Sequence, residues 1–115
     1  MTSRYPSRGD IWLVNLNPAR GHEQAGVRPS LVVSVDLFSQ GPAELVVVVP
    51  LTTTARGIPL HVEVAPPEGG LRQRSYIKCE DIRSISRGRL MEHWGTVSSD
   101  TMAEVEERLK ILLGL

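Results

Sequence analysis

The chain is organised around the stretch Gly21-His22-Glu23-Gln24-Ala25-Gly26-Val27-Arg28-Pro29, which runs directly into Ser30-Leu31-Val32-Val33-Ser34-Val35. The second segment is rich in β-branched residues and predicts a strand over about 30–36. The first is a polar loop flanked by glycines, which allow backbone angles that other residues resist. Pro29 fixes its own φ and favours an extended Arg28. The sequence therefore predicts a guanidinium held at the start of a strand, where it suits a phosphate.

The remaining sequence predicts several short strands. The run Leu45–Val49 is continuously apolar, which predicts a central strand that is buried on both faces and ends at Pro50. Three threonines, Thr52 to Thr54, follow it and offer a cluster of hydroxyl donors, although a plain threonine turn is the simpler interpretation. Further strands are predicted over residues 10–16, 60–64, 75–78 and 82–85, with a short one within 94–97. Phe38 to Ala43 is expected to turn the chain.

One helix is predicted at the C-terminal end. Residues 98–101 offer N-cap oxygens, and Glu104 follows Thr101 at capping-box spacing. Gly114 is suited to end the helix. The residues with helical spacing, which are expected to pack inward, are Met102, Val105, Leu109 and Leu112. Short strands followed by a single helix predict a mainly β domain, a small antiparallel barrel with a C-terminal α-helix.

Length and composition limit the alternatives. A chain of 115 residues predicts one domain over 1–115, and residues 1–7 are expected to be mobile because they contain few apolar anchors. Cys79 is the single cysteine, so no intrachain disulfide and no multi-cysteine metal cluster is possible. The sequence has neither an apolar signal-peptide core nor an apolar run of membrane-spanning length, which predicts a cytoplasmic protein with no membrane contact.

The charge is unevenly distributed along the chain. The formal net charge is zero, yet residues 71–90 carry six basic and two acidic side chains, a net charge of +4. We refer to residues 71–90 as the basic segment. It is interpreted either as a surface for an acidic partner or as arginine decoration of an edge strand, and charge alone does not decide between them.

Three spaced motifs give the sequence a family resemblance. They are Gly21-x-Glu23-Gln24-x-Gly26-x-Arg28-Pro29, then Pro50-Leu51-Thr52-Thr53, then Glu80-Asp81-Ile82-Arg83-Ser84-Ile85. With the opening Arg8-Gly9-Asp10-Ile11-Trp12, they resemble the MazF/PemK family of bacterial toxin endoribonucleases over roughly residues 8–115. The resemblance implies an SH3-like barrel that assembles as a homodimer.

The resemblance also implies an activity. Such toxins cleave single-stranded RNA, typically mRNA, at short sequences without a metal or other cofactor, and so inhibit translation. The RNA's own 2′-hydroxyl attacks the adjacent phosphorus, which leaves a 2′,3′-cyclic phosphate and a 5′-hydroxyl. The protein then has to stabilise charge on the phosphoryl oxygens and assist proton transfer.

Individual residues match the family's functional positions. Arg28 and Thr52 match the catalytic positions, where Arg28 is expected to stabilise the phosphate charge and Thr52 to donate its hydroxyl. An alternative role for Arg28 is a salt bridge to Glu23 that only shapes the loop. Asp81 stands where a glutamine is more usual, so the base that is recognised stays open. The residues expected to contact RNA are His22, Glu23, Gln24, Thr53, Arg56, Glu80, Asp81 and Arg83.

Three aromatic or histidine side chains have a structural and a functional interpretation. Trp12 is expected to pack at the edge of the core rather than stack on a base. His22 is expected to be an exposed loop histidine, with proton transfer as the alternative. His61 is expected to be a surface residue of its strand.

The resemblance implies a second partner besides single-stranded RNA. It is a MazE-like antitoxin whose acidic C-terminal tail covers the RNA site, and the basic segment is suited to pair with such a tail. The alternative from another functional class is a non-catalytic barrel of the same fold that acts on a protein or nucleic acid, such as DNA gyrase.

Overall fold

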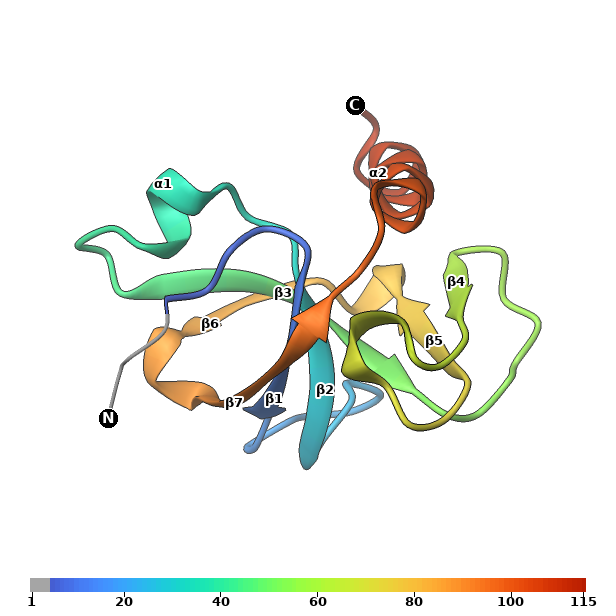
Figure 1. Ribbon diagram of the computed structural model, residues 1–115, viewed down its shortest axis with the longest axis horizontal. Coiled ribbons are helices and arrows are strands. Elements are labelled where there is room, and N and C mark those ends of the chain that lie inside the picture. The colour runs from blue at the N-terminus through green and yellow to red at the C-terminus, as the bar shows by residue number, and fades with distance from the viewer. Residues whose placement is uncertain (1–4) are drawn as a thin grey trace.

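The computed structural model describes residues 5–115 and contains a bent antiparallel sheet with a helix across one face (Figure 1). The strands are β1 (Asp10–Asn15), β2 (Val27–Val32), β3 (Leu45–Thr52), β4 (His61–Val64), β5 (Ser75–Lys78), β6 (Arg83–Ser86) and β7 (Leu90–Thr96). The helices are α1 (Asp36–Ser39) and α2 (Ser99–Leu113). Single 3-10 turns form η1 (Glu68–Gly70), η2 (Cys79–Asp81) and η3 (Arg87–Arg89).

Strand β3 is the centre of the sheet. The order is β4-β5-β3-β2-β1-β7, and β6 pairs with the first half of β3. Within residues 5–115, no ladder joins β4 to β7, so the barrel is not closed. The architecture is nevertheless the predicted one, mainly antiparallel β with a C-terminal helix.

The prediction that the central strand ends at Pro50 is wrong, because β3 continues to Thr52. On one side of β3, pairing with β6 ends at Val48 and pairing with β5 begins at Leu51. Pro50 lies between these two partners, where no ladder hydrogen bond requires its missing N–H. The strand can therefore change partners at the proline without a break.

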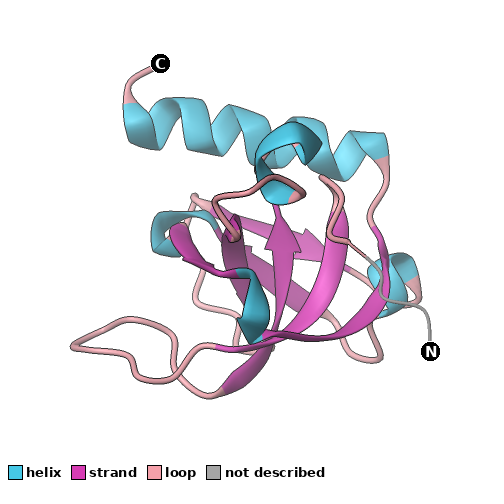
Figure 2. Cartoon of the chain, turned by 90° about the vertical axis from the view of Figure 1, so that its left-hand side faces the viewer, coloured by secondary structure: helices cyan, strands magenta, loops and turns pink. Residues whose placement is uncertain are grey.

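Two apolar clusters occupy opposite faces of β3, as the continuous apolar run predicts. Val49 and Leu51 belong to a cluster that also contains Val105 of α2, whereas Val46 and Val48 pack with Trp12 and its neighbours. Figure 2 shows α2 lying across one side of the sheet. The predicted inward stripe of α2 ends at Leu109, because Leu112 is 37% exposed.

Both ends of α2 have specific caps. The Ser98 hydroxyl accepts a hydrogen bond from the Thr101 amide at 3.1 Å, so Ser98 is the N-cap. Thr101 instead donates its hydroxyl to Glu68 Oε2 at 2.5 Å and ties the helix to η1. Gly114 ends the helix with φ of 71°, a left-handed angle that favours glycine.

Several predicted bounds differ from the observed ones. β2 begins at Val27 rather than about Ser30, because β1 pairs with it as far back as Val27. β7 begins at Leu90, before the predicted start near residue 94, because β1 pairs with it as far back as Leu90. The short helix α1 begins at Asp36, the predicted end of the second strand, and includes only residues 38 and 39 of the predicted turn.

The N-terminal end was predicted to be mobile over residues 1–7. Residues 1–4 of that prediction lie outside the described part of the chain. Within the remainder, the Ser7 amide donates to Asp10 Oδ2 at 2.9 Å and Gln40 Nε2 donates to the Pro6 carbonyl at 3.1 Å. Among residues 5–115, no helix combines the length and apolarity needed to cross a membrane.

Candidate active site

The two predicted catalytic residues lie at neighbouring ends of β2 and β3. Ser30 of β2 is opposite Pro50 of β3, where the ladder between the two strands ends, and Arg28 and Thr52 each lie two residues farther along their strands. Because side chains alternate along a strand, both lie on the face that Ser30 and Pro50 share. Thr52 is also opposite Tyr76 of β5. Arg28 and Thr52 therefore form a pair, the Arg28–Thr52 pair, at adjacent strand ends.

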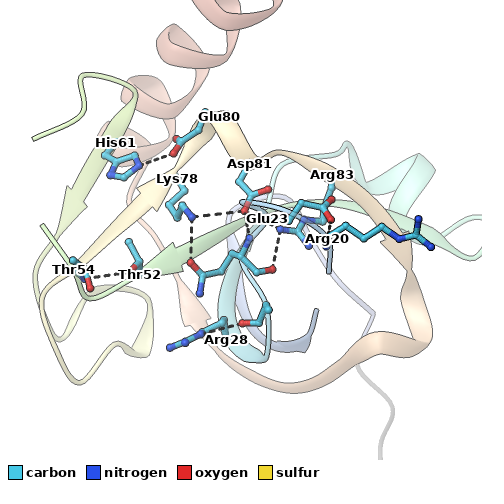
Figure 3. A network of polar contacts seen from close by, with 12 residues as sticks. Arg20, Glu23, Arg28, Thr52, Thr54, His61, Lys78, Glu80, Asp81 and Arg83 are labelled. Atoms are coloured by element: carbon cyan, nitrogen blue, oxygen red, sulfur yellow. Dashed lines mark hydrogen bonds and ion pairs between the residues drawn. The ribbon is translucent and has the colours of Figure 1, made fainter. Parts of the chain in front are cut away.

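The Arg28 side chain is exposed and is held mainly by its own loop. Its Nε donates to the Ala25 carbonyl at 3.3 Å (Figure 3). Gly26 makes this local turn with φ of 83°, which a side chain at that position would strain. The terminal guanidinium nitrogens stay available for an anion.

The alternative salt bridge from Arg28 to Glu23 is not formed. Within residues 5–115, no carboxylate lies within 4.0 Å of the Arg28 guanidinium. The Glu23 carboxylate instead accepts a hydrogen bond from the Arg20 amide at 2.6 Å. Glu23 thus closes its own turn.

The Thr52 hydroxyl is oriented by the chain that follows it. Its Oγ1 accepts a hydrogen bond from the Thr54 amide at 3.2 Å. A hydroxyl has one donor and two acceptor sites, so this bond leaves the hydroxyl hydrogen free to be donated. Thr52 can therefore donate to an oxygen bound beside it.

A polar network on the neighbouring elements contrasts with this pair. Asp81 Oδ2 accepts hydrogen bonds from the backbone N–H of Gln24 and from Arg83 Nη2, both at 2.8 Å. It also lies 3.8 Å from Lys78 Nζ. Lys78 donates to the side-chain Oε1 of Gln24 at 3.2 Å, and Arg83 donates to the backbone carbonyl of Gln24 at 3.1 Å. Gln24, Lys78, Asp81 and Arg83 form the Asp81 network, which anchors the signature loop to β5, η2 and β6.

A hollow of about 300 Å³ opens beside the Asp81 network. It is lined by residues from the signature loop, β5 and η2, namely His22, Glu23, Lys78, Glu80 and Asp81. Carboxylates and a lysine facing one hollow can accept from base amino groups and donate to base carbonyls. This arrangement suits recognition of an unpaired base.

His61 is not the surface residue that the sequence predicts. Its side chain is only 4% exposed, and its Nε2 lies 2.8 Å from Glu80 Oε2. The register places His61 opposite Lys78, beside η2, where Glu80 covers it. Strand alternation alone could not reveal this cover, because it comes from a turn distant in sequence.

The remaining predicted contact residues are distributed differently. Thr53 and Arg56 are exposed in the loop after β3. Farther along the basic segment, Arg87 donates to the carbonyls of Ser39 and Gly41, at 3.1 and 3.0 Å. The later arginines of the basic segment therefore hold backbone, whereas Arg72 and Arg74 are exposed.

Two other side chains are excluded from catalysis by burial. Trp12 is 7% exposed and donates from Nε1 to Asp10 Oδ2 at 3.3 Å, so it packs in the core as predicted. Burial, helped by the nearby Glu80 charge, raises the pKa of the Cys79 thiol to about 11. The thiolate is then scarce near neutral pH. Across residues 5–115, no group of three or more potential ligands is placed to hold a metal ion.

The fold and these motifs match one family. A family model described as the PemK-like, MazF-like toxin of type II toxin–antitoxin systems matches residues 7–113. The chain belongs to the MazF/PemK toxin family, whose members are endoribonucleases, and the resemblance seen in the sequence is confirmed.

Solved structures agree with this assignment. MazF from Deinococcus radiodurans is similar at 32% identity and a TM-score of 0.88, over 98% of this chain and all of that chain. An endoribonuclease from a mycobacterial species, solved with its cognate antitoxin, is similar at 30% identity and a TM-score of 0.79, over 96% of each chain. The Deinococcus radiodurans MazE–MazF complex (Form-II) is similar at 32% identity and a TM-score of 0.81, over 98% of this chain and 99% of that chain.

Proposed function

We propose that this protein is a sequence-specific, metal-independent endoribonuclease that cleaves single-stranded RNA, chiefly mRNA, and so inhibits translation. The observation that carries the proposal is the Arg28–Thr52 pair. It is supported by three features: both residues lie at neighbouring ends of β2 and β3, Arg28 has no carboxylate partner within residues 5–115, and the Thr52 hydroxyl hydrogen is free to donate. Such a pair is suited to a phosphate that is becoming more negative.

In the proposed reaction the RNA supplies its own nucleophile. The 2′-oxygen bonds to the adjacent phosphorus as the bond from phosphorus to the 5′-oxygen breaks. The 2′-hydroxyl proton is lost, and a proton is gained by the leaving 5′-oxygen, so the products are a 2′,3′-cyclic phosphate and a 5′-hydroxyl. The expected role of the protein is to orient the strand and stabilise the phosphoryl oxygens.

Arg28 and Thr52 have different proposed roles. Arg28 binds the non-bridging phosphoryl oxygens and stabilises their developing charge, since a guanidinium rarely gives up a proton. Thr52 donates its hydroxyl to the same phosphoryl group. Neither role requires a metal ion.

The hollow beside the Asp81 network is the proposed base-reading site. His22, Glu23 and Glu80 line this hollow, while Gln24, Asp81 and Arg83 mainly hold the loop in place. Thr53 and Arg56 extend the contact along the loop after β3. Asp81 in place of a glutamine is expected to change which base is read.

The proposal includes a homodimer and an antitoxin, in a cytoplasmic toxin–antitoxin pair. Two of the similar structures are a MazE–MazF complex and an endoribonuclease with its cognate antitoxin. We expect the antitoxin here to present an acidic segment to the exposed basic side chains, among them Arg28 and Arg72. Such an antitoxin competes with RNA for this surface.

The test is to incubate the protein with a mixed RNA pool in EDTA and to map the fragment ends. Cleavage with cyclic phosphate and 5′-hydroxyl ends is expected. Activity that is lost in EDTA and restored by a divalent ion would contradict the mechanism. Intact RNA under all conditions, with the protein folded, would favour the non-catalytic barrel.

A further inference from the structure

A tryptophan in β7 is displaced from the regular strand by a bulge. Ile11 of β1 is opposite Gly95, but the next residue, Trp12, is opposite His93, so Trp94 is the extra residue. A bulge turns a side chain away from the direction that strand alternation would give, and bulges often lie next to functional sites. Trp94 belongs to none of the sequence motifs, so the bulge could not be predicted from them.

Close backbone packing holds this bulge in position. A Cβ on Gly70 would lie 2.1 Å from the Trp94 carbonyl oxygen, and one on Gly95 would lie 2.6 Å from the Gly69 carbonyl carbon. Only glycine allows η1 to approach the bulge this closely. The position of Trp94 is therefore fixed by the fold.

Trp94 lines a cavity of about 240 Å³. Its other lining residues are Pro29, Thr53, Leu71, Arg72, Gln73 and Ser75. The Arg72 guanidinium carbon lies 5.5 Å from the centroid of the Trp94 ring, within cation–π range. We refer to this cavity as the Trp94 pocket.

The indole presents carbon rather than its N–H to the pocket. Trp94 is partly exposed, yet its Nε1 is shielded from solvent and has no hydrogen-bond partner among residues 5–115. What remains accessible is therefore aromatic surface, next to the exposed plane of Arg72. Aromatic rings and guanidinium planes are the groups on which unpaired bases stack.

The pocket and the Arg28–Thr52 pair are built from consecutive residues of the chain. Two of its lining residues, Pro29 and Thr53, directly follow Arg28 and Thr52 in the chain. Successive strand residues are about 3.3 Å apart and point to opposite faces. A strand of RNA with its phosphate at the pair can therefore pass around the strand ends and reach the pocket with a neighbouring nucleotide.

We infer that the Trp94 pocket binds a base of the RNA strand next to the scissile phosphate, by stacking against Arg72 and Trp94. The inference rests on the proposed function, because it takes RNA as the ligand. It adds a second subsite of a different kind. The hollow beside the Asp81 network is lined by hydrogen-bonding groups that discriminate between bases, whereas stacking in the Trp94 pocket tolerates any base.

Fluorescence of Trp94 tests this directly. Short 2′-deoxy oligonucleotides of A, C or T have no attacking hydroxyl, so they bind without being cleaved. Their binding to wild-type protein is expected to quench tryptophan emission with all three bases, and Trp94→Leu is expected to abolish the quenching. Because Trp12 is buried, it should contribute little to the change.

The matched pair Arg72→Gln and Arg74→Gln separates stacking from charge. Both arginines are exposed and lie in one loop, but Arg74 pairs with Glu63 and does not line the pocket. Arg72→Gln should weaken oligonucleotide binding roughly 5- to 100-fold, the range for losing one stacked base, and Arg74→Gln much less. Equal losses in the two variants would overturn the inference.

Other outcomes are also decisive. Quenching that depends on protein concentration without oligonucleotide would mean that a second copy covers the pocket, and would overturn the inference. Wild-type RNA cleavage without Trp94 quenching would reject the pocket and leave the proposed function standing. Quenching without any RNA cleavage would support the pocket but reject the proposed chemistry.

Discussion

The Asp81 network and the Arg28–Thr52 pair lie side by side and use their polar groups in opposite ways. In the network, Asp81 accepts from Gln24 and Arg83, and Lys78 bonds back to Gln24. In the pair, the Arg28 guanidinium makes one hydrogen bond to its own loop and no ion pair within residues 5–115. The charged groups of the network are paired with one another, whereas the Arg28 guanidinium stays available to a substrate.

This difference has a physical basis. An arginine already paired with a carboxylate would have to break that pair before binding a phosphate, and part of its binding energy would be lost. A free guanidinium on a stiff loop needs little reorganisation when charge develops. The network provides that stiffness by fixing Gln24, four residues before Arg28.

The largest expected effect is a loss of cleavage rate when the Thr52 hydroxyl is removed. Thr52→Val should lower the cleavage rate on the order of 100- to 1,000-fold, because one donor to the phosphoryl group is lost. Its matched control is Thr54→Val, which changes the neighbouring hydroxyl but keeps the amide that orients Thr52. Rates on the same RNA pool check this, and equal losses in both variants would remove the special role of Thr52.

The next largest effect is expected in the Asp81 network, as a loss of unfolding free energy. Asp81→Asn removes the charge that Arg83 and Lys78 face, and should lower the unfolding free energy by roughly 1.5–3 kcal/mol. The cleavage rate should fall less than in Thr52→Val, because the loop shifts while the pair survives. Urea unfolding checks the stability, and an unchanged midpoint would show that the network does not hold the loop.

A smaller effect is expected at Glu68, which belongs neither to the Arg28–Thr52 pair nor to the Asp81 network. Burial by itself would raise the pKa of Glu68, but hydrogen bonds from Thr101 and Ser98 outweigh it and hold the pKa below its ordinary value of 4.5. Glu68→Gln should cost about 1 kcal/mol of stability at neutral pH with no change in cleavage rate.

The pH dependence of that loss follows from the direction of the shift. A lowered pKa in the folded state stabilises the protein above the ordinary carboxyl pKa, and this contribution disappears as pH falls through the folded value. Urea unfolding of wild type and Glu68→Gln should therefore converge in acid. A difference that stays constant from neutral pH to acid would contradict the charge-based account.

The fold was predictable where local signals decide it. The strand over residues 75–78 has its predicted bounds, and the helix begins after Ser98 and ends at Gly114 because caps are local in sequence. Where distant pairing decides, the prediction failed. β3 passes through Pro50 because its partner changes there, which no local pattern reveals.

The candidate site shows the same division. The motifs marked Arg28 and Thr52, which the fold places at neighbouring ends of β2 and β3. They did not indicate that η2 buries His61, or that a bulge turns Trp94 toward the strand ends. Both features arise from segments remote in sequence that meet only in the folded sheet.

The central claim is that Arg28 is kept free for the substrate whereas Arg83 is committed to the fold. Measuring urea unfolding and single-turnover RNA cleavage in parallel for Arg28→Ala and Arg83→Ala tests it most directly. The account predicts that Arg28→Ala unfolds like wild type but cleaves on the order of 100-fold or more slowly, while Arg83→Ala is clearly destabilised and loses less activity. The account would be contradicted if Arg28→Ala were the less stable of the two, or if it cleaved RNA at the wild-type rate.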